Sequence, residues 1–486
     1  MTRNVPSTSS RSRWLALCVL CAGMLMIVLD ATIVNVALPS IQRDLRFSQS
    51  GLAWVVNAYL IPFGGLLLLA GRLGDLIGRR RVFLAGLIVF TAASLACGLS
   101  GSETMLIAAR LVQGVGGAMT STVILGMIVT MFVEPREQAR AIGVFSFTAA
   151  AGGSVGLLTG GVLTQVINWH WIFFVNLPIG LVAAVAASRL LEGDRGIGVR
   201  AGADAPGAAL VTAALMVGVY TIVETSELGW TSTRTLGFGA LAVLLMAGFL
   251  VRQATAANPL LPFQVFRSRG VLGANLVQVL LMPGMMGMFF LGALYLQRVL
   301  GYDPLQIGLA FLPAAATIGA LSFRFSAQLN VRFGARAMLL AGLGLVVAGL
   351  ALFARMPVGA SYLVDVLPAM LLVGVGMGLV FPALMTLGMS GATPSDAGLV
   401  SGVMSTTQQV GGSLGLAVLA TLASSRAGSL LAGGQSPAAA LTGGSDAAFL
   451  IGAVLAAAAV AVAATVLRGG RASQPESAAD LADQAA

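Results

Sequence analysis

Two charged side chains interrupt long apolar segments and are the first candidates for chemistry. Asp30 lies in LDATIVNVALPSI, and Arg110 lies in ARLVQGVGGAM. A charge at mid-membrane costs about 2.5–3.5 kcal/mol, so each should face a cavity or a partner. A lone carboxylate of this kind can bind and release a proton, with Arg110 tuning it through charge or a hydrogen-bond network. The alternative interpretation is a structural ion pair that locks two helices together.

A second candidate is the arginine-rich turn GRLGDLIGRRRVF, which begins at Gly71. Its glycines allow a tight turn and close helix approach, and its acidic residue can pair with arginines or cap a helix end. One hypothesis is a conformational latch whose charge pairs differ between two access states. The other is simple anchoring of the inner face by positive charge. The residues of this predicted gating turn are Gly71, Asp75, Gly78, Arg79 and Arg80.

Small and neutral polar residues supply two further sets of candidates. Gly152, Gly156 and Gly160, with Gly161 beside them, form a small-residue ridge suited to close helix packing. Candidate polar groups of a substrate cavity, each of which could instead bond between helices, are Asn57, Tyr59, Gln113, Gln278, Gln408 and Gln409. The predicted span 305–328 contains no acid, which favours a neutral, zwitterionic or anionic substrate over a dication.

Other reactive residues give weaker indications. Residues 152–156 match G-x-S-x-G, but the string lies within a predicted helix and recurs at 411–415, so an intramembrane enzyme is only a remote alternative. One histidine and three cysteines do not suggest a zinc site, and no phosphate-binding loop is present. His170 lies between two tryptophans, which suggests interfacial anchoring rather than a proton relay. We therefore expect no enzymatic activity, cofactor, metal or nucleic-acid partner.

Composition defines the elements that must position these residues. The chain has 486 residues, of which 57% are hydrophobic and only 9% charged. A soluble protein normally carries about 25% charged residues, so a soluble enzyme or nucleic-acid binder is excluded. Apolar runs of bilayer length predict an all-α polytopic membrane protein with fourteen spans. These lie near 14–37, 52–70, 82–99, 105–132, 139–163, 169–190, 206–224, 235–251, 271–296, 305–328, 337–354, 362–389, 398–423 and 447–467.

The arginines orient these spans. With the N-terminus in the cytoplasm, 20 arginines fall on the inner side and six on the outer side. This distribution obeys the positive-inside rule and predicts that both termini are cytoplasmic.

An internal repeat organises the spans. GGSVGL at Gly152 returns as GGSLGL at Gly411, and LAGL at Leu84 returns at Leu340. The offset predicts two six-helix pseudo-repeats with two inserted helices between them, around a central cleft. The predicted domains are a cytoplasmic tail (1–13), an N-terminal bundle (14–190), the inserted pair (206–251), a C-terminal bundle (271–467) and a disordered cytoplasmic tail (468–486).

The motifs quoted above, with WHWIFFVNLPIG, resemble the signature segments of the fourteen-span drug:proton antiporter family of the major facilitator superfamily. The resemblance implies proton-driven export of a drug or antibiotic across the bacterial inner membrane, with Asp30 and Arg110 in proton coupling. One departure is Leu157, where the antiporter signature of the fifth helix has proline, and it weakens the assignment of antiport.

Proton-coupled uptake or facilitated transport of a metabolite is the alternative within transport. The expected partners are a small-molecule substrate, protons and membrane lipids, and the chain is expected to function as a monomer. Self-resistance in an antibiotic producer is a further hypothesis.

Overall fold

The structure is a computed structural model. It describes residues 10–467 except 49, 133, 192, 194–195, 197, 199–202, 258, 323–325 and 391–396. All regular elements within these residues are helical, and twelve helices are long and apolar enough to span a membrane. Most of the N-terminal tail predicted at 1–13 and the whole tail predicted at 468–486 lie outside the described residues.

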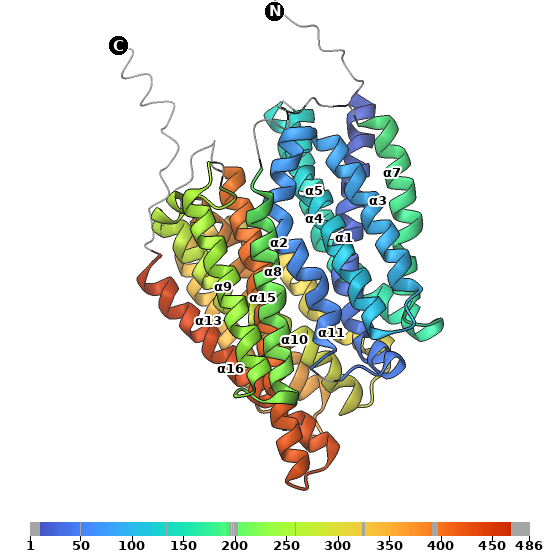
Figure 1. Cartoon of the computed structure of the whole chain (residues 1–486), viewed down its shortest axis with the longest axis vertical. Helices are drawn as coiled ribbons and strands as arrows, with labels where there is room; N and C mark the ends of the chain where they lie inside the picture. Colours follow the sequence, from blue (N-terminus) through green and yellow to red (C-terminus); the bar gives the residue numbers. More distant parts are fainter. Residues whose placement is uncertain are drawn as a thin grey trace, which may run out of the picture.

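The first six predicted spans correspond to seven helices, which lie together in Figure 1. The sixth span is divided into a short α6 and the longer α7. The helices are α1 (Ser10–Leu45), α2 (Ala53–Ile77), α3 (Arg79–Gly98), α4 (Glu103–Met131), α5 (Pro135–Val166), α6 (Trp171–Phe174) and α7 (Asn176–Leu190).

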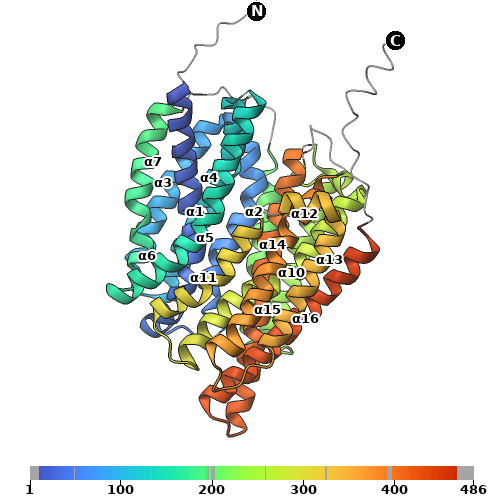
Figure 2. The ribbon, with the colours of Figure 1, turned by 180° about the vertical axis from the view of Figure 1, so that it is seen from behind.

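The last six predicted spans form the second half, which Figure 2 shows from behind. Over the predicted span 305–328 the structure describes two helices, α11 and the short α12. A π-helix, η4, precedes α14. The helices are α10 (Arg269–Arg298), α11 (Pro304–Ala320), α12 (Ser326–Phe333), α13 (Ala335–Phe353), η4 (Tyr362–Val366), α14 (Leu367–Met389), α15 (Ala397–Ala432) and α16 (Pro437–Thr465).

The inserted pair consists of α8 (Ala205–Leu228) and α9 (Thr233–Thr255), followed by the 3-10 helix η2 (Phe263–Arg267). α8 packs against α9, α2 and α15. Its apolar residues Leu215 and Val219 form a small core with Ile61 of α2 and Ala417 of α15. The insertion therefore lies against both halves through α8.

Local sequence explains where several helices begin and end. The Ser102 side chain accepts from the Met105 N–H and caps α4, and Asp303 and Gln306 form a reciprocal capping box at α11. Gly78 separates α2 from α3 with φ 104°, a conformation that favours glycine. α1 and α15 each have 36 residues, longer than predicted, because a helix can continue into its polar ends beyond the apolar run that the prediction measured.

The two halves contact each other closely at the end of the molecule opposite the α2–α3 turn. There α5 packs against α11, and Gly161 is so close that a Cβ would lie 2.9 Å from the Pro304 carbonyl oxygen. Arg298, at the end of α10, donates to the Gln42 side chain of α1 at 2.7 Å. Figure 2 shows α5 and α11 side by side. This end is closed by contacts between the halves.

Candidate functional site

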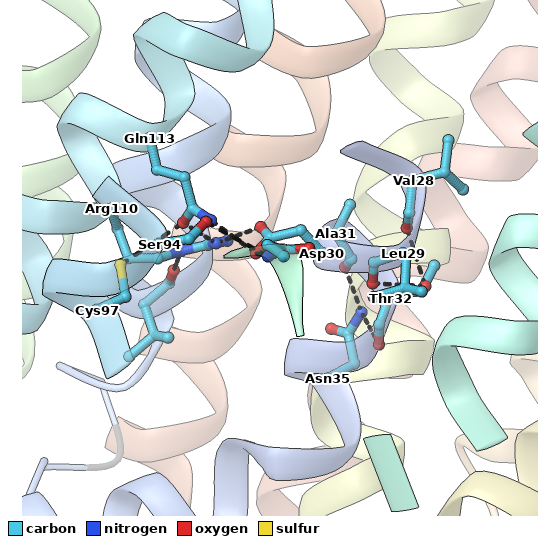
Figure 3. Close-up of polar contacts among 12 residues, drawn as sticks. Val28, Leu29, Asp30, Ala31, Thr32, Asn35, Ser94, Cys97, Arg110 and Gln113 are labelled. Atoms are coloured by element: carbon cyan, nitrogen blue, oxygen red, sulfur yellow. Dashed lines mark hydrogen bonds and ion pairs between the residues drawn. The ribbon is translucent and has the colours of Figure 1, made fainter. Parts of the chain in front are cut away.

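Asp30 and Arg110 form a direct ion pair in the interior of the first half. Arg110 Nη1 donates to Asp30 Oδ2, and both side chains are buried, with 0% of Asp30 and 1% of Arg110 exposed. Figure 3 shows the two side chains pointing toward each other from α1 and α4. A buried pair of this kind needs further hydrogen bonds to offset the loss of hydration.

Two amides supply those bonds at the other carboxylate oxygen. Gln113 Nε2 donates to Asp30 Oδ1 at 2.7 Å, and Asn176 Nδ2 donates to the same oxygen at 3.1 Å. The same two amide nitrogens also donate to Ser94 Oγ, at 2.8 and 3.4 Å. The carboxylate is therefore surrounded by donors, which occupy both of its oxygens.

Arg110 is held by further groups from α2 and α4. Its Nε donates to the Val55 carbonyl at 3.0 Å, and its Nη1 donates to Gln113 Oε1 at 2.7 Å. The guanidinium carbon lies 4.5 Å from the ring centroid of Tyr59, a cation–π distance. These contacts fix the arginine independently of Asp30.

Helix geometry explains the convergence. Arg110 and Gln113 are three residues apart on α4, so they lie on one face. Close packing of α4 against α2 and α3 depends on glycine, because a Cβ on Gly114 would lie 2.4 Å from the Tyr59 carbonyl oxygen, and one on Gly116 would lie 2.5 Å from the Phe90 nitrogen. The polar groups thus come together between α1, α3, α4 and α7.

Sequence reasoning missed Ser94, Cys97 and Asn176 as members of this site. Cys97 Sγ lies 3.6 Å from Gln113 Oε1, and Asn176 is the first residue of α7. A neutral polar side chain in an apolar helix costs little free energy, so its presence in the sequence does not by itself indicate a functional site. The one available indication was that Asn176 belongs to the quoted segment WHWIFFVNLPIG.

The predicted gating turn lies between α2, α4 and α7. Arg79 forms an ion pair with Asp75 at 3.3 Å and donates to the Gly126 carbonyl of α4 at 3.0 Å. Arg80 Nη2 donates to the Ser188 carbonyl in the last turn of α7. Gly198 N donates to the Leu76 carbonyl at 3.1 Å, so Gly198 lies against this turn. Gly71 is more open, since its nearest neighbour beyond the helix is Thr122, 3.9 Å from a built Cβ.

The glycine ridge of α5 has two faces. Gly152, Gly156 and Gly160 lie against α1, where Cβ atoms would meet Leu25, Thr32 and Ile33. Gly161 instead lies against α11 of the second half. The ridge therefore packs within the first half, whereas Gly161 contributes to the contact between the halves.

The predicted cavity residues lie in different places. Gln113 belongs to the Asp30 network, and the Tyr59 ring covers Arg110. Asn57 of α2 is fully buried, and neither polar atom of its side chain has a hydrogen-bond partner among the described residues. Gln278 of α10 is buried, with its Oε1 likewise unpartnered there. Gln408 and Gln409 of α15 are half-buried, and Gln409 lies against Gly64 of α2.

His170 lies at the closed end, away from Asp30. Its Nδ1 lies 3.0 Å from the Gly98 carbonyl oxygen, and its ring stacks on Trp169, whose Nε1 donates to Asp44 at 2.8 Å. Within the part of the chain that the structure describes, no cluster of three or more histidine, cysteine or acidic side chains could hold a metal ion.

A bundle of apolar helices with a repeated architecture and a buried charge pair defines a multi-pass membrane transporter. The sequence profile of the Major Facilitator Superfamily matches residues 20–416, and the chain belongs to this superfamily. The resemblance drawn from the motifs is confirmed.

Characterised relatives are similar over most of their length. The puromycin resistance protein of Streptomyces alboniger is 39% identical over 89% of this chain and 86% of its own. The cephamycin export protein of Amycolatopsis lactamdurans is 38% identical, over 84% and 85%. The tetracenomycin C resistance and export protein of Streptomyces glaucescens is 34% identical, over 87% and 79%.

Solved transporters share the fold. A bacterial homologue of the human lysosomal transporter Spinster, in an inward-facing and unoccupied conformation, has a TM-score of 0.66 at 18% identity, covering 96% of this chain and all of its own. The POT family transporter PepTSo has a TM-score of 0.67 at 15% identity, covering 94% and 99%.

Proposed function

We propose that this protein exports a small-molecule drug or antibiotic across the bacterial cytoplasmic membrane in exchange for protons. The observation that carries the proposal is the Asp30 carboxylate, buried within the helices and bound only by donors. Relatives named for resistance to puromycin or for export of cephamycin support the outward direction of drug movement over uptake.

The arginine distribution assigns the two ends of the molecule. The α2–α3 turn, with its four arginines, lies at the cytoplasmic end, together with both termini. The contacts between α5 and α11 then close the periplasmic end. A closed periplasmic end is what the proposed cycle requires of the state that receives cargo from the cytoplasm.

The coupling step is the protonation of Asp30. In the outward-open state, a proton from the periplasm neutralises the carboxylate, and the attraction to Arg110 and the amide donors weakens. The protein then switches to the inward-open state, where proton loss restores the network and accompanies cargo binding. One charge crossing 100 mV supplies about 2.3 kcal/mol, enough for roughly a 50-fold gradient of a neutral substrate.

The gating turn serves as the latch between states. Arg79 and Arg80 hold α2 and α3 to α4 and α7 in the present arrangement. These four helices all belong to the first half, so the bonds at this turn hold the cytoplasmic end of that half together, and their rearrangement changes the balance between the two states.

The substrate is a neutral, zwitterionic or anionic compound that the protein moves without chemical conversion. Asn57 and Gln278, one from each half, are buried polar groups with unpartnered atoms among the described residues, and such groups gain from a hydrogen-bonding cargo.

We further propose that one chain suffices for transport, with lipids around it. Self-resistance in a producer agrees with the names of the relatives.

Drug susceptibility tests the proposal. The chain is expressed in an efflux-deficient bacterial host and challenged with puromycin, tetracenomycin C and the cation ethidium. We expect resistance to one or both antibiotics, lost on addition of a protonophore and in Asp30→Asn. Resistance that persists with a protonophore, or a preference for dications in a wider panel, contradicts the proposal.

A further inference from the structure

Asn176 carries an unexplained polar atom inside the Asp30 site. The residue is 0% exposed, and its Nδ2 bridges Asp30 and Ser94. Its Oδ1 is buried and has no hydrogen-bond partner among the described residues. A buried acceptor left unpaired costs free energy, so the amide gains a hydrogen bond if it turns this oxygen toward a donor.

Protonation of Asp30 supplies such a donor on the side where Asn176 now presents its Nδ2. The titratable or charged side chains that face Asp30 are Arg110 on α4, Tyr59 on α2 and Cys97 on α3. The groups that bond the carboxylate do so through N–H, so a new O–H on Asp30 meets donors rather than acceptors. The amide of Asn176 is the adaptable neighbour, because rotation by about 180° exchanges its NH₂ for its carbonyl oxygen.

We propose that Asn176 is the positioning residue that reads the protonation state of Asp30 and that α7 transmits this state to the α2–α3 turn. With Asp30 ionised, Asn176 Nδ2 donates to Oδ1. With the proton on Oδ1, the turned amide accepts from the new O–H, and the Ser94 hydroxyl changes from acceptor to donor. The inference rests on the proposed proton coupling. It identifies Asn176 as the residue that transmits the protonation state of Asp30 to α7.

The second half of the inference comes from α7 itself. The helix begins at Asn176, and its last turn holds the carbonyl of Ser188, which accepts from Arg80. The two residues are twelve positions apart, about 18 Å along an α-helix. A single short helix thus touches the carboxylate with its first residue and the gating turn with its last turn. A shift of α7 at Asn176 must therefore reach Arg80.

Hydrogen–deuterium exchange of the purified full chain tests the transmission without any cargo. Four proteins are compared at one pH, namely wild type, Asp30→Asn as a mimic of the neutral acid, Asn176→Leu and the double variant. We expect Asp30→Asn to accelerate exchange in 71–81 and 185–191 by at least about threefold, and to have no such effect when Asn176 is leucine. An equal effect of Asp30→Asn in both backgrounds, or no effect in either, overturns the inference.

Transport in vesicles separates this role from a structural one. The probe is the panel antibiotic to which the chain confers most resistance. Asn176→Leu should lower proton-driven uphill transport at least about tenfold while changing downhill exchange by less than about threefold. Asn176→Thr, whose hydroxyl can both donate and accept, should restore uphill transport. Asn35→Leu on α1 serves as the matched control, since among the described residues the Asn35 amide donates to carbonyls of its own helix.

The outcomes distinguish the two proposals. Equal loss of uphill and downhill transport in Asn176→Leu, with no rescue by threonine, assigns a structural role and overturns the inference alone. Normal uphill transport by Asp30→Asn overturns the proposed function together with it.

Discussion

Gly308 of α11 lies directly against the backbone carbonyl of Leu157 of α5, where a Cβ built on the glycine would be 2.5 Å from the carbonyl oxygen. The contact joins the two halves at the closed end. Leu157 is the position at which the chain departs from the antiporter signature, and its side chain is buried. A backbone carbonyl of α5 therefore takes part in closure whether or not the residue is proline.

Gly308→Ala should weaken this closure. The added methyl group meets backbone rather than a flexible side chain, so the halves must separate, at a cost of about 1–3 kcal/mol. We expect a lower Tm in detergent and faster labelling of a cysteine introduced at Leu305. Gly153→Ala on α5 is the matched control, because nothing lies within 4 Å of its Cβ position. Unchanged labelling in Gly308→Ala argues against closure at this contact.

Arg80 should slow amide exchange at the C-terminal end of α7, and Arg336 should slow it at the C-terminal end of α16. Arg80 donates to the Ser188 carbonyl of α7, and Arg336, 256 positions later, donates to the Ala464 carbonyl of α16. Loss of one such bond costs about 1 kcal/mol. Arg80→Ala should speed amide exchange about fivefold in the last turn of α7 and leave α16 unchanged, whereas Arg336→Ala should do so in the last turn of α16 and leave α7 unchanged. Exchange that rises in both helices with either variant contradicts this assignment.

Arg110→Gln should be more damaging than the charge-free double variant. Removing the arginine leaves the buried Asp30 carboxylate without its counter-charge, at a cost of about 3–5 kcal/mol. Asp30→Asn together with Arg110→Gln removes both charges and should recover much of the folded protein. The amount of monodisperse protein after detergent extraction measures this difference. Equal yields from the two variants show that the pair contributes little to folding.

Asp204 should give the fold a pH dependence at low pH. This buried residue caps α8 and binds Arg252 and Gln253 of α9. Burial opposes ionisation, but the hydrogen bonds from Arg252, the Gly207 N–H and Gln253, with the charge of Arg252, hold the pKa of Asp204 below its ordinary value of 3.8. The native state thus binds fewer protons here than the unfolded chain, so this stabilisation is present above about pH 3.8 and is lost as the pH falls through the lower, native pKa.

Asp204→Asn should therefore lower the Tm at pH 7 by more than it does near pH 3. Thermal unfolding in detergent at the two pH values gives the comparison, with wild type at each pH as the reference. A deficit that stays the same at both pH values shows that the charge of Asp204 is not what stabilises this end of α8 and α9.

The sequence allowed much of this architecture to be predicted, because lipid imposes a simple rule on composition. Fourteen apolar runs, the insertion and the membrane charges Asp30 and Arg110 follow from the cost of burying polar groups. The neutral residues Ser94 and Asn176 could not be assigned, since their cost is small and the helical period does not tell which of several neighbouring helices a face contacts. The contact between Gly308 and Leu157 could not be predicted either, because the two residues are about 150 positions apart in the sequence and belong to different halves.

The most direct test of the account is transport by purified protein in vesicles with an imposed pH difference. Using the antibiotic identified by susceptibility profiling, wild type should accumulate cargo against its gradient only while the pH difference or a voltage is present. Asp30→Asn should equilibrate the cargo downhill without accumulating it. Uphill movement by wild type that ignores both the pH difference and the voltage, or normal accumulation by Asp30→Asn, would contradict the claim that a proton on Asp30 drives export.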